Sequence, residues 1–201
     1  MKIAIDIVLT LPKDIISAIF QINKEIVKAW GDKLILKKGF GTPHISILMW
    51  CIDEKNIPAL ISELKNIAKQ TASIPLKIQK TAQKKLLAWD TMYSIRTSKP
   101  RTMKILHKKI FGTLLDKLSF DAKAEMLSPQ TKSLGPTLEW INGHRKKSDY
   151  KFFHPHIMVW IWWDANPKIN FPQDFISSHL AIYQLWAYCA CTKKIAGINL
   201  V

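Results

Sequence analysis

Two stretches of the sequence decide how this chain is interpreted: Gly39–Leu48, GFGTPHISIL, and Lys151–Trp160, KFFHPHIMVW. Each has a Gly or apolar approach, then Pro-His-Ile, then a run of apolar residues that is typical of a buried β-strand. A chain that enters a strand twice through the same tripeptide is expected to use the two positions together. The repetition therefore predicts that His44 and His156 face one site.

Composition and charge limit the class of protein. With 201 residues, of which 48% are hydrophobic, the chain can build a folded core as one domain or as two fused lobes. Thirty Lys and Arg residues against fifteen Asp and Glu residues give a net charge of +15. Such an excess favours an anionic partner such as nucleic acid, a nucleotide or an anionic membrane surface. A Lys-rich solvated surface is the alternative interpretation.

Cysteine usage and the N-terminus indicate the compartment. The three cysteines, Cys51, Cys189 and Cys191, are too few and too unevenly spaced for a disulfide framework, which points to a reducing environment. The segment Lys2–Leu11 is apolar but contains Asp6, and it lacks the features of a signal peptide. No apolar run approaches the roughly 18 residues that a membrane span requires. We expect a soluble, cytoplasmic, monomeric protein with no membrane partner.

Strand and helix patterns alternate along the chain. Strands are expected at 2–11, 43–52, 74–81, 86–97, 156–163 and 180–192, with a turn at 82–85; helices are expected at 15–30, 57–67, 103–118 and, within an irregular segment, near 137–142. We predict an α+β fold of two pseudo-symmetric lobes, with antiparallel-rich sheets flanked by helices around a central cleft. The whole chain, 1–201, would be one domain, with a lobe boundary near 97–101 and one histidine motif in each half.

The two motifs resemble those of a known family. His44-Ile45-Ser46-Ile47 matches the His-x-Thr/Ser-x motif of the two-histidine (2H) phosphoesterase superfamily, and His156-Ile157-Met158-Val159 stands where the second copy would be. Over nearly its whole length the chain is similar to the 2′-5′ RNA ligase and cyclic phosphodiesterase group. The resemblance implies a metal-independent phosphoesterase without a cofactor. Its substrate would be a 2′,3′-cyclic phosphate on an RNA end or nucleotide, with reverse 2′-5′ RNA ligation as a further reaction.

The chemistry gives the motif residues their expected roles. Opening a cyclic phosphate needs a base that takes a proton from water and an acid that gives one to the departing ribose oxygen, and imidazoles suit both tasks near neutral pH. His44 and His156 are therefore the predicted acid and base, in either order. Residues i and i+2 of a strand share a face, so Ser46 would point into the same cleft and donate a hydrogen bond to a phosphate oxygen.

Met158 is the departure from the family pattern, because it stands where the family has Thr or Ser and it can donate no hydrogen bond. Lys151, His154 or Arg145 is then expected to supply the missing charge. An alternative function follows from the same residue, namely a catalytically impaired member that binds RNA or a nucleotide. The predicted substrate-binding residues are Met158, Lys151, His154, Arg145, Trp89, Tyr93, Trp186 and Tyr188.

A zinc site is the competing chemistry. His154 and His156 stand two positions apart, as do Cys189 and Cys191, and four such ligands would suit tetrahedral zinc. The separations are not those of structural zinc sites, so we predict no metal. His107, in a helical pattern beside two lysines, is expected on the surface. His144 precedes Arg145, Lys146 and Lys147, which form either a phosphate-steering loop or a solvated basic loop.

Overall fold

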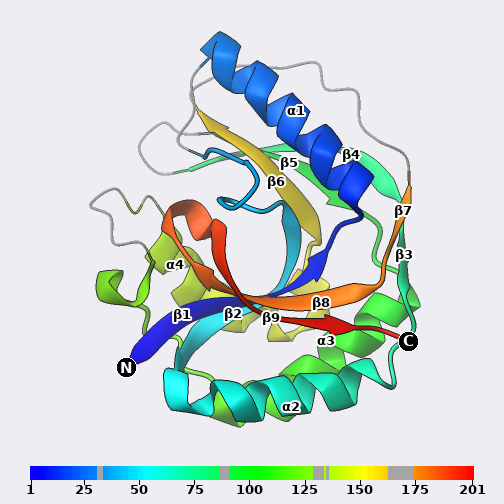
Figure 1. Cartoon of the computed structure of the whole chain (residues 1–201), viewed down its shortest axis with the longest axis vertical. Helices are drawn as coiled ribbons and strands as arrows, with labels where there is room; N and C mark the ends of the chain where they lie inside the picture. Colours follow the sequence, from blue (N-terminus) through cyan, green and yellow to red (C-terminus); the bar gives the residue numbers. More distant parts are fainter. Residues whose placement is uncertain (31–33, 87–90, 129–133, 135, 163–173) are drawn as a thin grey trace.

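A seven-stranded sheet runs through the computed structural model, which describes residues 1–30, 34–86, 91–128, 134, 136–162 and 174–201. The strand order is β4-β5-β6-β2-β1-β8-β9, and neighbouring strands pair antiparallel (Figure 1). Their bounds are β1 Lys2–Thr10, β2 His44–Asp53, β4 Ile78–Lys85, β5 Thr91–Thr97, β6 His156–Trp162, β8 His179–Leu185 and β9 Cys191–Asn199. A second, two-stranded antiparallel sheet joins β3, Ile74–Leu76, to β7, Phe175–Ser177.

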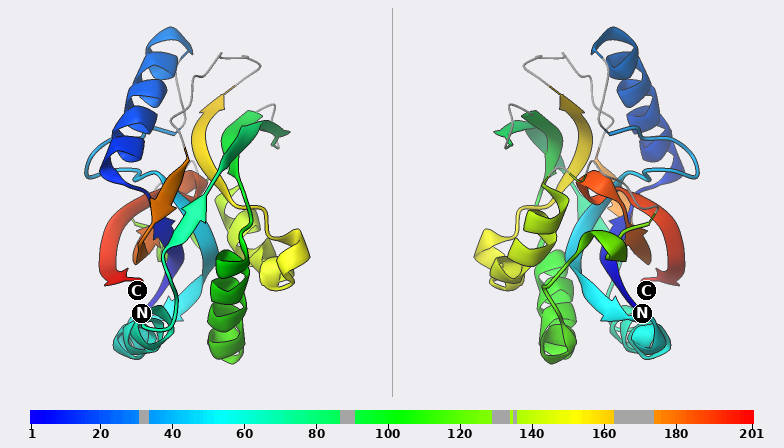
Figure 2. Two further views of the ribbon diagram at one scale, coloured as in Figure 1. Left: turned by 90° about the vertical axis from the view of Figure 1, so that its right-hand side faces the viewer. Right: turned by 90° about the vertical axis from the view of Figure 1, so that its left-hand side faces the viewer.

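The helices cover the sheet from several sides. They are α1 Lys13–Trp30, α2 Ile57–Ala68, α3 Arg101–Leu114 and α4 Thr137–Asn142, and short 3₁₀ segments such as Gly143–Ser148 follow α3 and α4. The helices α1 and α3 lie on opposite sides of the molecule, with the strands between them, whereas α2 packs beside α3 (Figure 2). No helix in the described part of the chain is long and apolar enough to cross a membrane.

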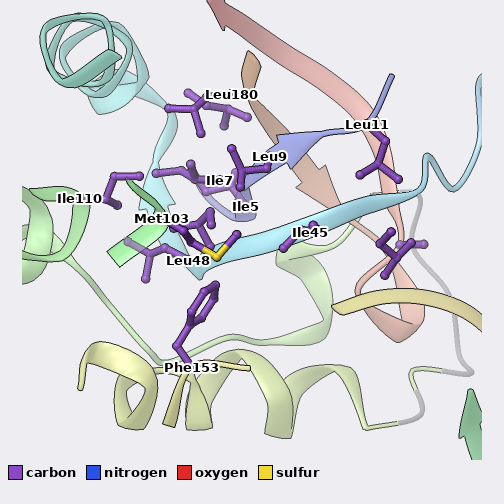
Figure 3. Close-up of a cluster of buried hydrophobic side chains, with 14 of the residues drawn as sticks. Ile5, Ile7, Leu9, Leu11, Ile45, Leu48, Met103, Ile110, Phe153 and Leu180 are labelled. Atoms are coloured by element: carbon purple, nitrogen blue, oxygen red, sulfur yellow. The ribbon is translucent and has the colours of Figure 1, made fainter. Parts of the chain in front are cut away.

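Both faces of β1, a strand in the interior of the sheet, are buried, which explains its nearly continuous apolar sequence. Ile3, Ile5, Ile7 and Leu9 belong to the larger hydrophobic cluster, together with residues of α2 and α3, as Figure 3 shows in part. Ala4 and Val8 point to the other face and belong to a second cluster, to which α4 contributes Ile141. Asp6 lies between Ala4 and Val8, so its carboxyl group is placed on this second face.

Three local predictions were wrong. The single strand expected at 74–81 is divided at Lys77 into β3 and β4, which belong to different sheets. Residues 82–85 are not a turn but the end of β4, and their polar side chains suit a strand at the edge of the sheet, where only one neighbour pairs with it. The expected strand 180–192 is interrupted, because β8 ends at Leu185 and β9 begins at Cys191. Tyr188 and Cys189 form the connection with φ of 56° and 55°, and without a Gly or Pro this turn gave no sequence signal. Parts of two other expectations, 87–90 and 163, lie outside the described residues.

The lobe boundary near 97–101 stays a prediction, but the strand pairing shows how the two halves of the chain meet. Strand β5, which ends at Thr97, pairs with β6 from the second half of the chain, and β1 pairs with β8. Strands from both sides of 97–101 therefore share one sheet, because antiparallel pairing joins β5 to β6 and β1 to β8. The two motif strands are nevertheless neighbours, since β2 and β6 adjoin at the middle of the sheet.

Candidate functional site

The two Pro-His-Ile segments adopt the same local geometry. Each histidine is the first residue of its strand, and each ring donates from Nδ1 to the carbonyl oxygen two residues earlier. The distances are 2.7 Å from His44 to Thr42 and 2.8 Å from His156 to His154. Because a carbonyl oxygen only accepts, this bond places the proton of the neutral ring on Nδ1 and leaves Nε2 as the acceptor. The repeated tripeptide thus produces two identically oriented imidazoles.

The sheet brings these two rings to one cavity. Strands β2 and β6 pair antiparallel at Ile45 and Ile157, a register that puts position 44 opposite 158 and position 46 opposite 156. His44, Ser46, His156 and Met158 all line a cavity of about 330 Å³. The prediction that the two motifs face one site agrees with this placement.

The remaining polar lining of the cavity is mostly basic. It includes His154 and three lysines, Lys84, Lys146 and Lys147, with Glu139 as its carboxylate. Lys84 comes from the edge strand β4, whereas Lys146 and Lys147 belong to the 3₁₀ segment Gly143–Ser148. A cavity lined by imidazoles and ammonium groups suits an anionic ligand.

Asp6 joins the site from β1, and sequence reasoning did not assign it a role. Its side chain is 0% exposed, and its Oδ2 accepts a 2.6 Å hydrogen bond from the Ser46 hydroxyl. The same oxygen lies 3.6 Å from Nε2 of His44, and Sγ of Cys191 lies 3.6 Å from that nitrogen. Burial raises the pKa of Asp6 well above its usual range, against the lowering effects of the Ser46 hydrogen bond and the Lys147 charge.

This contact changes the role that Ser46 can play. A serine hydroxyl has one proton, and here that proton is donated to Asp6. The hydroxyl therefore offers the cavity an acceptor, and the predicted bond to a phosphate oxygen would require the bond to Asp6 to break. Ser46 holds the carboxyl group beside His44 in this arrangement.

The two histidines have different electrostatic surroundings. Burial lowers the pKa of His156 to about 4, the hydrogen bond to His154 acts against this, and the charge of Lys147 lowers the pKa further. Burial also lowers the pKa of His44, and the bond to Thr42 acts in the opposite direction. Of the two rings, only that of His44 has a carboxyl group within 4 Å among the described residues. Burial thus favours the neutral form of both rings, and the Asp6 carboxyl group is placed to stabilise the ring of His44 when that ring is protonated.

The four zinc ligands that the sequence suggested do not form one group in the described part of the chain. Among the described residues, the His, Cys, Asp and Glu atoms close enough to hold a metal ion are those of Asp6, His44 and Cys191, which lie within 4.8 Å of one another. His154, His156 and Cys189 are not part of this group. An ion there would occupy Nε2 of His44, so metal binding and proton transfer at that nitrogen exclude each other.

The other predicted binding residues mostly lie away from the cavity, with His154 and Met158 as the exceptions. Arg145 is exposed, and Lys151 forms an exposed 3.1 Å ion pair with Asp149. Neither basic residue lines the cavity, so the missing hydroxyl at position 158 is not replaced by either of them.

The aromatic candidates are mainly core residues. Tyr93 is buried with its ring centroid 4.8 Å from that of Trp160, and Tyr188 is buried in the turn before β9. Trp186 is half-buried and packs edge-on against Phe40 at 4.7 Å. Trp89 lies outside the described residues. Strand alternation could not show which faces were buried, and burial on both faces of the sheet placed these rings in the core.

His107 and His144 are both buried, which corrects the prediction that His107 lies on the surface. His107 is 0% exposed, and its Nε2 donates to the carbonyl oxygen of Lys147 at 2.9 Å. His144 is 1% exposed, with Nε2 3.4 Å from the carbonyl oxygen of Ile47 in β2. The ring of His144 is thus not solvated, because the 3₁₀ segment that carries it packs against the sheet. Both rings attach the basic segment Gly143–Ser148 to the core.

Sequence reasoning missed Asp6 and did not single out three charged residues of the cavity lining, Lys84, Glu139 and Lys147. Asp6 and Lys147 each left a partial signal. Asp6 is the lone charge in the apolar strand IAIDIVL, and a carboxyl group in a buried strand needs a partner. Lys147 belongs to a run of basic residues, HRKK, in which the sequence does not distinguish the one that turns inward. Burial of a single lysine is decided by the packing of the 3₁₀ segment.

Solved structures of very different sequence share this fold. The protein TT0787 of Thermus thermophilus is similar with a TM-score of 0.62 and 12% identity, and 98% of each chain is covered. LigT of E. coli in its apo form gives 0.61 and 13%, covering 100% of this chain and 99% of LigT. A protein described as a phosphoesterase gives 0.62 and 14%, again covering 100% and 99%. No family model and no curated protein matches the sequence.

These similarities confirm the α+β fold, which is that of LigT and of the solved phosphoesterase. They extend over the whole chain, so both motif strands belong to the shared architecture. At such low identities the comparison concerns the fold, and the chemistry of the cavity has to be argued from the residues of this chain.

Proposed function

We propose that this protein is a metal-independent 2H phosphoesterase that opens 2′,3′-cyclic phosphates at RNA ends or on nucleotides. The observation that carries the proposal is the pair of imidazoles with Nδ1 bonded to the backbone and Nε2 available, lining one basic cavity. E. coli LigT, which has the same fold, has been crystallised with phosphate, with 3′-AMP and with ATP. These ligands and the net charge of +15 support a phosphate ester as the substrate.

The surroundings of the two rings support a division of roles. A neutral His156, next to the Lys147 charge, accepts the proton of the attacking water. A protonated His44 is stabilised by the Asp6 carboxylate and donates its proton from Nε2 to the departing ribose oxygen. One P–O bond forms to the water oxygen and one P–O bond to ribose breaks, which leaves a phosphate monoester and a free hydroxyl group.

The second candidate function is binding of RNA or a nucleotide without turnover. Two observations favour it: Met158 offers the phosphate no donor, and the Ser46 proton is donated to Asp6. Hydrogen bonds to the developing charge are usually a large part of catalysis, so their loss would slow the reaction. Binding and turnover are therefore separate measurements.

The test is hydrolysis of a 2′,3′-cyclic mononucleotide and of an oligoribonucleotide ending in the same group, in the presence of EDTA. We expect turnover that survives the chelator and falls by about 10²–10⁴-fold in His44→Ala and in His156→Ala. His179→Ala is the control, because His179 is exposed and lies outside the cavity, and it should retain wild-type turnover. Salt-sensitive binding of both ligands without product would instead identify the binding protein.

A further inference from the structure

The cavity lacks hydroxyl donors at both positions where the motif pattern places them. At position 46 the hydroxyl proton is donated to Asp6, and at position 158 the side chain is a thioether without a donor. A phosphodiester carries its charge on non-bridging oxygens, which need hydrogen-bond donors or cations when they leave water. Another group has to supply them if the cavity holds a phosphate.

Lys147 is the residue placed to do so. It lines the same cavity as His44, His156 and Met158, and it is half-buried while its neighbours Arg145 and Lys146 are exposed. Within the described residues, no hydrogen bond or ion pair engages its ammonium group. An ammonium group that is partly removed from water without a contacting counter-ion is costly unless a ligand provides the negative charge.

The backbone of Lys147 is held in place by the core. Its carbonyl oxygen accepts the 2.9 Å hydrogen bond from His107, whose ring packs 4.5 Å from the ring of Phe111 and 4.8 Å from that of Phe153. Three residues earlier, His144 attaches the same segment to β2. The side chain therefore extends from a fixed origin, which reduces the entropy lost when its ammonium group binds a ligand.

The basic groups that line the cavity are close enough to shift one another's pKa values. Burial is the main cause of the lowered pKa of three rings, and the Lys147 charge lowers each of them further: His144, His154 and His156. Burial also lowers the pKa of Lys147 itself, Cys189 and Asp6 act against this, and Lys84 from the edge strand β4 adds to the lowering. Like charges brought together from separate elements repel each other, and an anion bound between them removes that repulsion.

We propose that Lys147 binds a non-bridging oxygen of the ligand phosphate and takes the place of the hydroxyl that is missing at position 158. The inference rests on the proposed function for the class of ligand, a phosphate ester, and it names the residue that recognises the phosphate. It holds for a binding protein as well as for an enzyme, because the contact is to the phosphate itself.

Binding of inorganic phosphate and of 3′-AMP, measured by titration calorimetry, tests the contact without relying on turnover. We expect Lys147→Met, which keeps the length of the side chain, to bind both ligands about 10- to 100-fold more weakly, the effect of losing one charge-assisted hydrogen bond. Arg145→Met is the matched control, because it removes a cation of the same segment that lies outside the cavity, and it should bind nearly as wild type. Wild-type affinity in a folded Lys147→Met variant would overturn the proposal.

A double-mutant cycle tests whether Lys147 stands in for the lost hydroxyl. Met158→Thr restores a donor opposite His44, so the loss caused by Lys147→Met should be several-fold smaller in the Met158→Thr background than in the wild type. An equal loss of affinity in both backgrounds would show that Lys147 does not take the place of the hydroxyl at position 158. Lys147→Arg should retain most of the affinity, which separates loss of charge from loss of folding. Absence of turnover in every variant would count against the proposed enzymatic function. The binding measurements of the double-mutant cycle would still test the role of Lys147.

Discussion

The regions around His44 and His156 share their backbone geometry and differ in what surrounds the ring. Both rings donate from Nδ1 to a carbonyl oxygen across a proline, at 2.7 Å and 2.8 Å. The fold places Asp6 and Cys191 beside the ring of His44, whereas the charge of Lys147 lowers the pKa of His156. Local sequence repetition thus produced similar ring orientations, and unrelated neighbours gave the two rings different charged groups, a carboxyl group near His44 and an ammonium group near His156.

The largest effect should come from removing the carboxylate that distinguishes the first region. In Asp6→Asn, an imidazolium at position 44 loses its partner, so the pKa of His44 falls. We expect the alkaline limb of kcat/KM against pH to move about one to three pH units lower. The measurement is the pH–rate profile with a 2′,3′-cyclic mononucleotide.

The control for this variant is Asp53→Asn, which alters a carboxylate at the opposite end of β2. It should leave the alkaline limb in place. If Asp6→Asn left the limb unmoved as well, the assignment of His44 as the acid would be wrong, because its protonated form would then not depend on Asp6.

A smaller effect, on stability, concerns His107, whose ring holds the backbone of Lys147 near the second region. Burial lowers the pKa of His107 from 6.5 to about 4, so between these values the unfolded chain binds more protons than the folded one. The free energy of unfolding should therefore decrease as pH falls through this window, by about 3 kcal/mol for this one group.

The measurement is urea unfolding at neutral pH and near pH 4, the pKa of His107 in the folded protein. His107→Gln keeps an N–H donor for the Lys147 carbonyl and removes the titrating ring, so its stability should depend less on pH. An unchanged pH dependence would show that His107 does not become charged on unfolding, which contradicts its buried neutral state.

The smallest effect on turnover is expected from Ser46→Ala. The variant leaves the buried Asp6 oxygen without its 2.6 Å donor and should lower the free energy of unfolding by about 1–3 kcal/mol. Turnover should fall less than about tenfold, because the hydroxyl proton is donated to Asp6 and not to the phosphate. A loss of about 10²–10³ in kcat would instead restore Ser46 as a donor to the phosphate.

The sequence predicted the parts of the fold and the site that depend on local pattern. The short helix near 137–142 and the strands that begin at His44 and His156 were located because apolar periodicity and the Pro-His-Ile repeat are local signals. The turn at Tyr188 was missed because its positive φ values occur without glycine. Polar residues 82–85 were interpreted as a turn because an edge strand has a similar composition.

The sequence by itself determined that two imidazoles are presented at the starts of two strands, since residue type and two-residue alternation fix which side chains a strand presents together. Tertiary structure alone decided their chemistry. Asp6 reaches Ser46 across 40 positions of the chain, and His107 reaches the Lys147 carbonyl across another 40. Such contacts depend on how strands and helices pack, and no periodicity within a segment records them, so the carboxylate beside one ring and the ammonium near the other emerged only from the fold.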